Sequence, residues 1–365
     1  MKNVLLLSLA LTGLCLSSAT WADTNVTRTL TESPAVAAGT RISVENLVGH
    51  MTVTQGPSFQ VTATVVAGGS KAQALAQSVK LDVDTSGKQV TVHVHYPVDQ
   101  YDSYRYVTHD DHDKVCVLGI VCFHGSGSSS MEYQGRQVRV YRGEDEGVPL
   151  HVDVAVRIPA GMQAKLVNEA GVLEANGLAN RLALDTSGGD VYAGKLSGDL
   201  TAGTDGGDLH VQELKGNLQA ATDGGDLYLS QATGDVHLDS DGGDGHISHA
   251  TGSLDAHTGG GDLYVTDYTS GSNVSLHTGG GDLDLVGDLA TAHNLEVDTG
   301  GGDADLKTSN LSLHLDASSG GGDISVRLPN ATKVDSSDYH YSADIGKAQG
   351  QGSISSGGGD INVSG

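Results

Sequence analysis

Large rings and positive charges are both scarce in this sequence. Its 365 residues include two Phe and one Trp against twelve Tyr, and 20 basic against 45 acidic side chains, which gives a formal charge of −25. The shortage of large rings excludes a wide globular core, so a narrow core of Val, Leu, Ile and Ala fits better. The excess of carboxylates repels nucleic acid and anionic membranes, and we expect neither as a partner.

Long apolar runs are missing beyond the N-terminus. Lys2 precedes an apolar run from Val4 to Leu16, and Thr20-Trp21-Ala22 ends in a small residue. This pattern predicts an export signal over residues 1–22. No later segment has the roughly 18 consecutive apolar residues of a membrane-spanning helix. We therefore expect an exported protein, periplasmic or secreted to the cell surface, without a transmembrane segment once the signal is removed.

Cysteine is scarce as well, with three in the chain. Cys15 follows Leu14 where a lipoprotein signal has a small residue, so we interpret it as part of the removed signal. Cys116 and Cys122 remain in an oxidising compartment with five residues between them. We predict a disulfide, with a free or metal-bound pair as the alternative. The nearby His109–Asp113 run and His124 lack four ligands at zinc-site spacing, which favours a solvated polar loop over a zinc or copper site.

Apolar alternation is present over residues 36–165, and it predicts β-strands. The expected buried faces are Ile42 and Val44; Val61, Ala63 and Val65; Val79, Leu81 and Val83; Val90, Val92, Val94 and Tyr96; and Val152, Val154, Val156 and Ile158. Helical spacing predicts one short helix over Ser70–Ser78, with Ser70 as its cap. The pattern fails over residues 97–149, which predicts an inserted loop or hairpin.

A repeat takes over from about Val172. Its unit is [Thr/Ser]-x-Gly-Gly-Asp, and its aspartates are spaced by 18 residues four times, then by 20, 21, 20 and 37. The aspartates are Asp190, Asp208, Asp226, Asp244, Asp262, Asp282, Asp303, Asp323 and Asp360. The Thr/Ser column comprises Thr186, Thr204, Thr222, Ser240, Thr258, Thr278, Thr299, Ser319 and Ser356. A fixed period of this size indicates a solenoid.

Each repeat contains two apolar halves separated by a glycine turn. Leu209, Val211, Leu214, Leu218 and Ala220 alternate in one unit, and the next unit has the same register. We predict an all-β fold: a parallel β-solenoid with 18–21 residues and two strands per coil, over residues 166–365. A β-rich region with one short helix precedes it over residues 23–165. The unit from Val172 lacks Gly-Gly-Asp and is interpreted as a capping coil, while the 37-residue step is interpreted as about two coils.

These motifs carry a resemblance to a known family. The segments ISVENLVGHMTV, VAVRIPAGM and VNEAGVLEANGL, followed by the Gly-Gly-Asp coils, resemble the bacterial "putative adhesin" domains of unknown function, which are related to autotransporter adhesin head domains. The resemblance covers residues 36–365 apart from the 97–149 insert. It implies an extracytoplasmic β-solenoid and supplies no catalytic residues.

The aspartates have two interpretations. Stacked coils place them in one column, and Asp205, Asp223 and Asp241 add a second acid in three coils. Hydrogen bonds to the turn backbone explain Gly and Asp together and are favoured. The alternative is a calcium ladder at Asp205, Asp208, Asp223, Asp226, Asp241 and Asp244, since Ca²⁺ takes several oxygen ligands. However, the nonapeptide of calcium-binding β-rolls is absent, so we expect weak calcium uptake at most and no other cofactor.

Two further columns accompany the aspartates. The Thr/Ser hydroxyls should point inward and bond across coils, because no base is placed to activate nine equivalent hydroxyls. Alternation places Tyr192, His210, Tyr228, His246 and Tyr264 outward. This stripe either steadies the sheet by ring stacking, which is favoured, or forms a platform for sugar rings or a partner.

Together these features predict an exported, non-enzymatic β-solenoid, an adhesin or cell-envelope scaffold that contacts an envelope or surface glycan or protein. A calcium- or metal-binding secreted module is the alternative. A β-helix polysaccharide-degrading enzyme is a further one, but the coils lack a unique constellation of acids and bases. The sequence predicts no oligomeric state.

Overall fold

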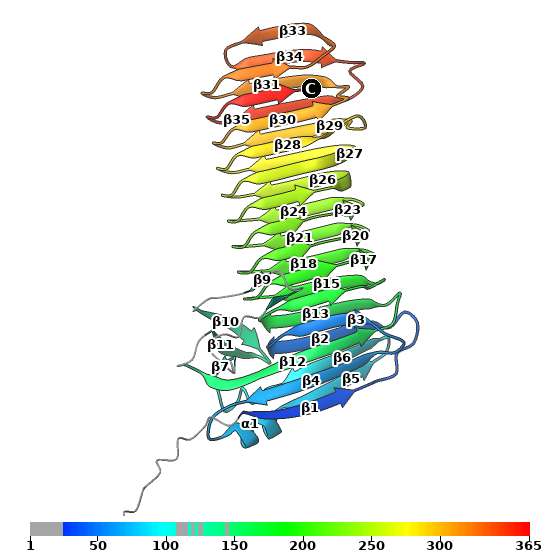
Figure 1. The fold of residues 1–365 in the computed structure, drawn as a ribbon, viewed down its shortest axis with the longest axis vertical. Helices are drawn as coiled ribbons and strands as arrows, with labels where there is room; N and C mark the ends of the chain where they lie inside the picture. The colour runs from blue at the N-terminus through cyan, green and yellow to red at the C-terminus, as the bar shows by residue number, and fades with distance from the viewer. Residues whose placement is uncertain (1–24, 107–115, 118–120, 123–126, 143–145) are drawn as a thin grey trace, which may run out of the picture.

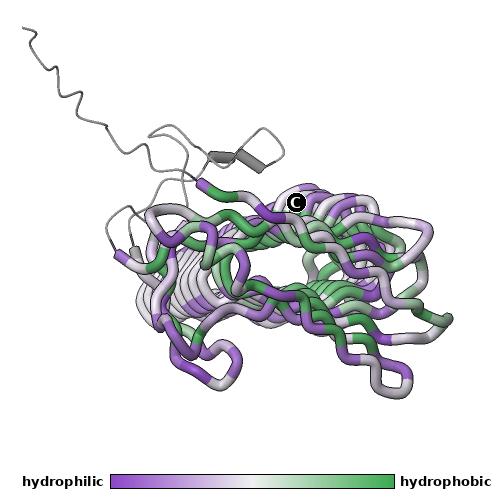
Figure 2. Tube along the Cα trace, turned by 90° about the horizontal axis from the view of Figure 1, so that it is seen from below, coloured by the Kyte–Doolittle hydropathy of each residue, from purple (hydrophilic) through white to green (hydrophobic). Residues whose placement is uncertain are grey.

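The protein is an elongated column of stacked β-strands (Figure 1). The computed structural model describes residues 25–106, 116–117, 121–122, 127–142 and 146–365. Within these residues, 34 strands join one continuous hydrogen-bonded sheet that winds around a narrow core. Viewed along the long axis, successive coils superpose (Figure 2). The predicted all-β parallel solenoid is confirmed.

The 18-residue coils contain three strands rather than the expected two. One coil comprises β19 (Leu209–Val211), β20 (Leu214–Lys215) and β21 (Leu218–Thr222), and each strand pairs in parallel with its equivalent 18 residues on. The extra strand is the two-residue β20, at the corner where the sequence pattern shows only Leu214 facing inward. The equivalent strands are β16 (Val191–Gly194), β17 (Leu196–Ser197), β18 (Leu200–Thr204), β22 (Leu227–Leu229), β23 (Ala232–Thr233), β24 (Val236–Ser240) and β25 (Gly245–Ser248).

The core is a column of aliphatic side chains in the predicted register. Leu209, Val211, Leu218 and Ala220 are at most 3% exposed. Coils approach closely at the Gly-Gly turns: a Cβ added at Gly225 would lie 1.9 Å from the carbonyl oxygen of Gly207. Glycine is therefore required there by the contact between neighbouring turns.

Coils of 20–21 residues continue the stack with local irregularities. The register shifts between Gly252 and Leu254, and again between Val265 and Tyr268, so that the longer coils stay aligned. The buried Tyr268 hydroxyl donates a hydrogen bond to the Gly252 carbonyl (2.7 Å). The strands here are β26 (Ala250–Thr258), β27 (Leu263–Thr278), β28 (Leu283–Asp288), β29 (Asn294–Thr299) and β30 (Ala304–Ser309).

The C-terminal coils are stacked out of sequence order. The final coil, β35 (Gln351–Ser356) and β36 (Ile361–Ser364), lies between β29–β30 and the preceding coil, β31 (His314–Ser319) and β32 (Ile324–Arg327) (Figure 1). An antiparallel hairpin, β33 (Ala331–Ser337) and β34 (His340–Ile345), extends the stack beyond β31. The 37-residue step therefore contains this hairpin, and the expectation of two further coils is wrong.

The N-terminal strands continue the solenoid at its base. β2 (Arg41–Val48) and β3 (Met51–Gln55) pair in parallel with β13 (Gln163–Ala170) and β14 (Leu173–Asn176), which in turn pair with β15 (Arg181–Thr186) and β16. The unit from Val172 thus bridges to the N-terminal strands as expected. The expected division after residue 165 falls inside β13, which is hydrogen-bonded on both sides.

Antiparallel strands close the base of the column. β1 (Val26–Glu32), β4 (Gln60–Ala67) and β12 (Val148–Ile158) lie below β3, and the hairpin β5 (Lys80–Ser86)–β6 (Gln89–His95) lies below β2. The alternation holds except in the edge strand β5, where Leu81 is only partly buried and Val83 is 38% exposed. The helix α1 (Ala72–Ser78) is confirmed, but Lys71 rather than Ser70 is its N-cap, without a side-chain hydrogen bond.

The 97–149 insert contributes a small sheet beside the base. β10 (Gly127–Tyr133) and β11 (Arg136–Arg142) form a hairpin, and β7 (Ser103–Arg105) pairs in parallel with β11 and with β12. Tyr96, Tyr104 and Tyr133 pack edge to face beneath it, with ring centroids 5.4 and 6.0 Å apart. A further antiparallel pair joins β8 (Cys116–Val117) to β9 (Val121–Cys122).

Candidate functional site

The five predicted stripe residues form one continuous stack of rings, here called the Tyr/His ladder: Tyr192, His210, Tyr228, His246 and Tyr264. Adjacent ring centroids are 4.6–5.1 Å apart and the planes are within 8° of parallel. The stack follows from the register, which places each ring directly above its neighbour in the next coil. The rings therefore cover each other's faces, and most of the ladder presents ring edges to its surroundings.

Exposure varies along the ladder. Tyr192 is 5% exposed and packs against Val172, whereas the other four rings are partly exposed. Outward placement is thus correct for the sheet face, but Tyr192 is buried. Burial lowers the pKa of His210, although the carboxylates of Asp208 and Asp190 oppose this shift. Burial and a bond to Asp226 raise the pKa of Tyr228 to about 12.

The Asp column runs beside the ladder and ties the coils together. The backbone N–H of Asp208 donates to Oδ1 of Asp190 (2.9 Å), and the same bond recurs from coil to coil up to Asp323, which donates to Asp360 (2.8 Å). The hydroxyls of Tyr228 and Tyr264 donate to Oδ2 of Asp226 and Asp262 (2.9 and 2.8 Å). The backbone partner of each carboxylate is thus the next coil rather than its own turn.

A similar arrangement at the second corner was missed by the sequence reasoning. The backbone N–H of Asp235 donates to Oδ1 of Asn217 (3.1 Å), and the N–H of Asn217 donates to Oδ1 of Asp199 (3.3 Å). Each residue follows a glycine with positive φ, such as Gly216. The available signal was the recurring Gly-[Asp/Asn] pair at the 18-residue spacing.

The Thr/Ser column is buried, and its hydroxyls bond across coils, as expected, at Thr204, Thr222 and Ser240, but within their own turn at Thr258, Thr278 and Thr299. Thr204 donates to the Gly189 carbonyl of the previous coil (2.8 Å) and accepts from the Gly207 N–H (3.1 Å). Thr278 instead donates to the Gly281 carbonyl of its own turn (2.6 Å). These bonds engage the hydroxyls in structural roles.

The second acids Asp205, Asp223 and Asp241 are exposed. Burial and the neighbouring Asp223 raise the pKa of Asp205. A surface hollow of about 330 Å³ is lined by Asp205, Asp223, Asp185 and Glu169, with Lys165 at its side. Among the residues that the structure describes, no group of three or more His, Cys, Asp or Glu side chains is arranged to hold a metal ion. Calcium binding at the predicted aspartates stays a prediction.

The predicted cysteine pair lies in the short antiparallel pair of strands β8 and β9. Cys116 and Cys122 lie opposite each other in the β8–β9 pair. Opposite residues in an antiparallel pair have Cα atoms about 4.5–5.5 Å apart, within the range that a disulfide spans. The disulfide stays a prediction, which intact mass before and after reduction with alkylation checks. The His109–Asp113 run, His124 and the expected signal over residues 1–22 lie outside the described residues.

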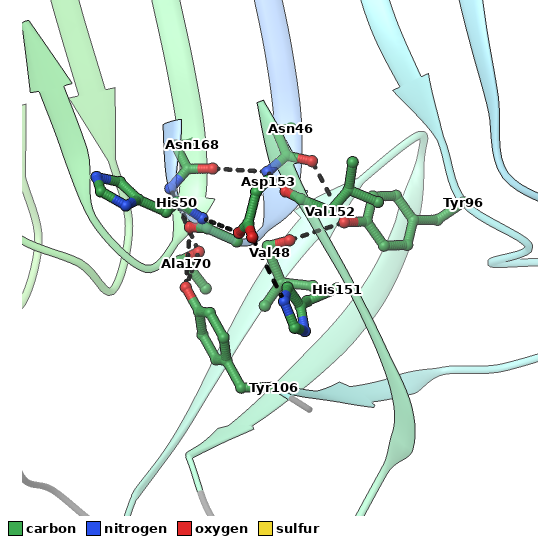
Figure 3. Close-up of polar contacts among 11 residues, drawn as sticks. Asn46, Val48, His50, Tyr96, Tyr106, His151, Val152, Asp153, Asn168 and Ala170 are labelled. Carbon is green, nitrogen blue, oxygen red and sulfur yellow. Dashed lines mark hydrogen bonds and ion pairs between the residues drawn. The ribbon is translucent and has the colours of Figure 1, made fainter. Parts of the chain in front are cut away.

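A buried polar network at the base was not predicted (Figure 3). Asn46 and Asn168 are fully buried and opposite each other, and Nδ2 of Asn46 donates to Oδ1 of Asn168 (2.8 Å). The Tyr96 hydroxyl donates to Oδ1 of Asn46 (3.2 Å) and to the Val48 carbonyl (2.8 Å). The alternation after Val44 already placed Asn46 inward, and a polar residue at an inward position was the available signal.

Charged groups extend this network toward the surface. Oδ1 of Asp153 accepts from the His50 backbone N–H (2.9 Å), and its Oδ2 lies 3.7 Å from Nε2 of His151 (Figure 3). Burial acts to raise the pKa of Asp153, but the bond and charge of His151 and the His50 contacts hold it below its usual range. The His50 ring faces Glu174 instead, at 3.7 Å. These side chains therefore stabilise the base and do not converge on one point.

The fold and its ladders define a class: parallel β-solenoid proteins built from coil-to-coil side-chain ladders. One family model matches residues 151–291 and 268–364, which together are more than half of the chain. The chain belongs to the Toastrack DUF4097 family. The expected membership in a family of domains of unknown function is confirmed at this level. None of the curated proteins matches the sequence.

Several solved structures are similar. A putative cell adhesion protein from Clostridium sporogenes is 8% identical, with 93% of this chain and 99% of that chain covered and a TM-score of 0.23. A putative adhesin from Parabacteroides merdae is 11% identical, with 71% and 96% covered and a TM-score of 0.34. A putative lipid binding protein from Parabacteroides distasonis is 8% identical, with 92% and 96% covered and a TM-score of 0.23. At these scores the similarities bear on neither ligand nor partner.

Proposed function

We propose that this protein is an exported, non-enzymatic binding scaffold of the cell envelope or surface, and that the Tyr/His ladder with its flanking Asp column is the contact surface. The observation that supports this proposal is that the same rings and carboxylates recur in successive coils. Catalysis needs one place where an acid, a base and a substrate pocket differ from their surroundings. A ladder of equivalent groups instead suits a partner that is contacted at several points along the column.

The stacking of the rings limits which groups of the ladder can contact a partner. Sugar rings stack on open aromatic faces, but the faces of His210, Tyr228 and His246 lie against their neighbours. Contact through ring edges, imidazole nitrogens and carboxylate oxygens therefore replaces the sugar-stacking platform considered from the sequence. An adhesive role of this kind agrees with the resemblance of the motifs to the bacterial "putative adhesin" domains of unknown function. No described helix is long and apolar enough to cross a membrane.

Co-sedimentation of the purified protein with isolated cell envelopes tests the proposal. We expect a variant with His210→Ser, Tyr228→Ser and His246→Ser to bind at least tenfold more weakly than the unmodified protein. The matched control carries His237→Ser and His257→Ser, exposed positions on β24 and β26, which are strands of the same stretch that carry no ladder residue. If the unmodified protein, the ladder variant and the control bind equally and have the same melting curve, the Tyr/His ladder is not the contact surface.

The second candidate function is a calcium-binding module. Its support is the hollow in which Asp205, Asp223, Asp185 and Glu169 gather. Burial raises the pKa of Glu169, and nearby carboxylates add to this shift. A bound cation would relieve that repulsion. Calcium titration followed by melting temperature separates the two candidate functions, because only the calcium-binding module should be strongly stabilised by micromolar calcium.

A further inference from the structure

The small sheet from the 97–149 insert has one buried and one open face. Its strands lie in the order β10, β11, β7, and β7 also pairs with β12. Tyr104, Met131, Tyr133, Val138 and Val140 are buried beneath it. Alternation therefore turns the intervening residues outward: Ser103, Arg105, Ser130, Gln137, Arg139 and Tyr141.

Two arginines lie on this outer face, and neither is in a salt bridge among the described residues, although the carboxylates of Glu146 and Asp102 act on Arg139 from a distance. Ser103 lies opposite Arg139, and Arg105 lies opposite Tyr141, so the two arginines are diagonal neighbours on adjacent parallel strands. The salt bridges of the described residues engage Arg136 and Arg181 but neither Arg105 nor Arg139. Nε of Arg105 is buried and has no hydrogen-bond partner. In a chain with a formal charge of −25, two such arginines side by side are unusual.

Neighbouring groups hold one of these arginines in place. Arg139 donates from Nη1 to the Tyr141 hydroxyl (3.2 Å) and from Nε to the Ser130 hydroxyl (3.4 Å). Because the Tyr141 oxygen accepts from Arg139, its own proton is free to point toward a ligand. The arrangement therefore offers guanidinium and hydroxyl donors on one side of the sheet.

Arg139, Tyr141 and Ser130 line a surface hollow of about 390 Å³, together with Ser103, Gln137, Val138 and Asp102, and Arg105 is outside this lining. Ligand pockets of small molecules start at roughly 300 Å³, so the hollow suits one or two sugar units. Hydroxyls, an amide and one carboxylate alternate around its edge, and these groups pair with sugar hydroxyls. The guanidinium fork matches the two oxygens of a carboxylate.

We propose that the outer face of the β7–β11–β10 sheet binds an acidic sugar, with its carboxylate at Arg139 and its hydroxyls at Tyr141, Ser103, Ser130, Gln137 and Asp102. Arg105, diagonal to Arg139 on the next strand, adds positive charge beside the hollow. The net charge of the chain repels densely charged polyanions. A single carboxylate on an otherwise uncharged sugar therefore fits better than nucleic acid or a polyphosphate. This site is separate from the Tyr/His ladder and does not depend on its function.

Ligand-observed NMR titration of the whole protein tests the site, with glucuronate, glucose and inorganic phosphate as probes. We expect glucuronate to bind at least tenfold more tightly than glucose, and more tightly than phosphate. Arg139→Gln should weaken glucuronate binding at least tenfold, and Arg105→Gln should weaken it to a smaller extent. Arg327→Gln removes the same charge at the opposite end of the column, from an exposed arginine that is in no salt bridge among the described residues, and should change nothing.

Three results overturn the proposal: equal affinity for glucuronate and glucose, phosphate binding more tightly than glucuronate, or full glucuronate binding by Arg139→Gln. Melting curves check that the variants are folded. If Arg139→Gln is unfolded, Arg139→Lys replaces it as the test of the site, because it keeps the positive charge and loses the forked guanidinium. Weaker glucuronate binding by the Lys variant supports the site, and unchanged binding refutes it.

Discussion

Two stretches of the solenoid share one fold but differ in their turns. The proximal coils have Asp205, Asp223 or Asp241 before the Gly-Gly pair, and the distal coils have a third glycine there, such as Gly279. In the distal turn the Gly279 N–H donates to the Thr258 carbonyl at 2.8 Å, whereas the equivalent bond from Asp223 to Thr204 is 3.3 Å. A Cβ at Gly279 would lie 2.1 Å from the Gly259 carbonyl oxygen.

This difference explains where the second acids occur. The distal turns approach so closely that a side chain does not fit, and the looser proximal turns leave room for one. Packing alone therefore accounts for the loss of the acid beyond Asp241. A calcium function is not needed to explain why the acids are confined to three coils.

Shortening the chain at residue 350 should have the largest effect, and it should be confined to the distal coils. It removes β35 and β36, so that β29–β30 and β31–β32 lose their shared neighbour. We expect amide protection to fall in β29–β34 by orders of magnitude while β18–β24 stay protected, because solenoid coils depend mainly on their neighbours. Hydrogen exchange measures this, and equal loss along the whole column would contradict it.

Alanine substitutions should separate the two kinds of turn. We expect Gly279→Ala to destabilise by about 1–3 kcal/mol, because the added Cβ meets backbone. Asp223→Ala, at the equivalent proximal position, should stay within about 0.5 kcal/mol. Gly280→Ala is the matched control, since a Cβ there meets nothing within 4 Å. Denaturant unfolding measures all three, and equal costs for Gly279→Ala and Asp223→Ala would remove the distinction.

Acid should act with opposite sign on the two stretches. Burial is the main cause that lowers the pKa of His210 in the folded protein. The unfolded chain therefore binds a proton at this residue at a higher pH than the folded protein does, and stability falls as the pH drops below about 6.5. The pKa of Asp284, which follows Tyr264 in the same column, is raised by burial and by Asp305, so its charge costs stability at neutral pH. His210→Phe should flatten the acid loss, and Asp284→Asn should raise the melting temperature slightly at pH 7. Melting curves from pH 5 to 8 check both, and unchanged pH slopes would contradict them.

Calcium should have the smallest effect. We expect little or no rise in melting temperature below millimolar calcium, with weak uptake at the proximal coils where the carboxylates are densest. The control replaces Asp205, Asp223 and Asp241 with Asn. A large rise at micromolar calcium that this control abolishes would favour the calcium module.

Periodicity predicted the regular part of the fold because every coil repeats the same letters. The inward residues, the Asp column and the ring ladder follow from an 18-residue register alone. Features that depend on contacts between distant segments did not follow: the Asn46–Asn168 pair joins strands 122 residues apart, and Tyr192 is buried although its ladder partners are partly exposed. The sequence also did not predict the outer face of the β7–β11–β10 sheet, because the insert has no repeat that would place Arg105 beside Tyr141.

The out-of-order stacking at the C-terminal end has a consequence for assembly. A simple solenoid can grow one coil at a time as its chain is made, since each coil needs only the one before it. Here β31 and β32 have no parallel partner strands on the column until residues 351–364 form β35 and β36 in the layer beneath them. We therefore expect the last two layers and the β33–β34 hairpin to fold only after residues 351–364 are available, because β35 and β36 join β29 and β30 to β31 and β32.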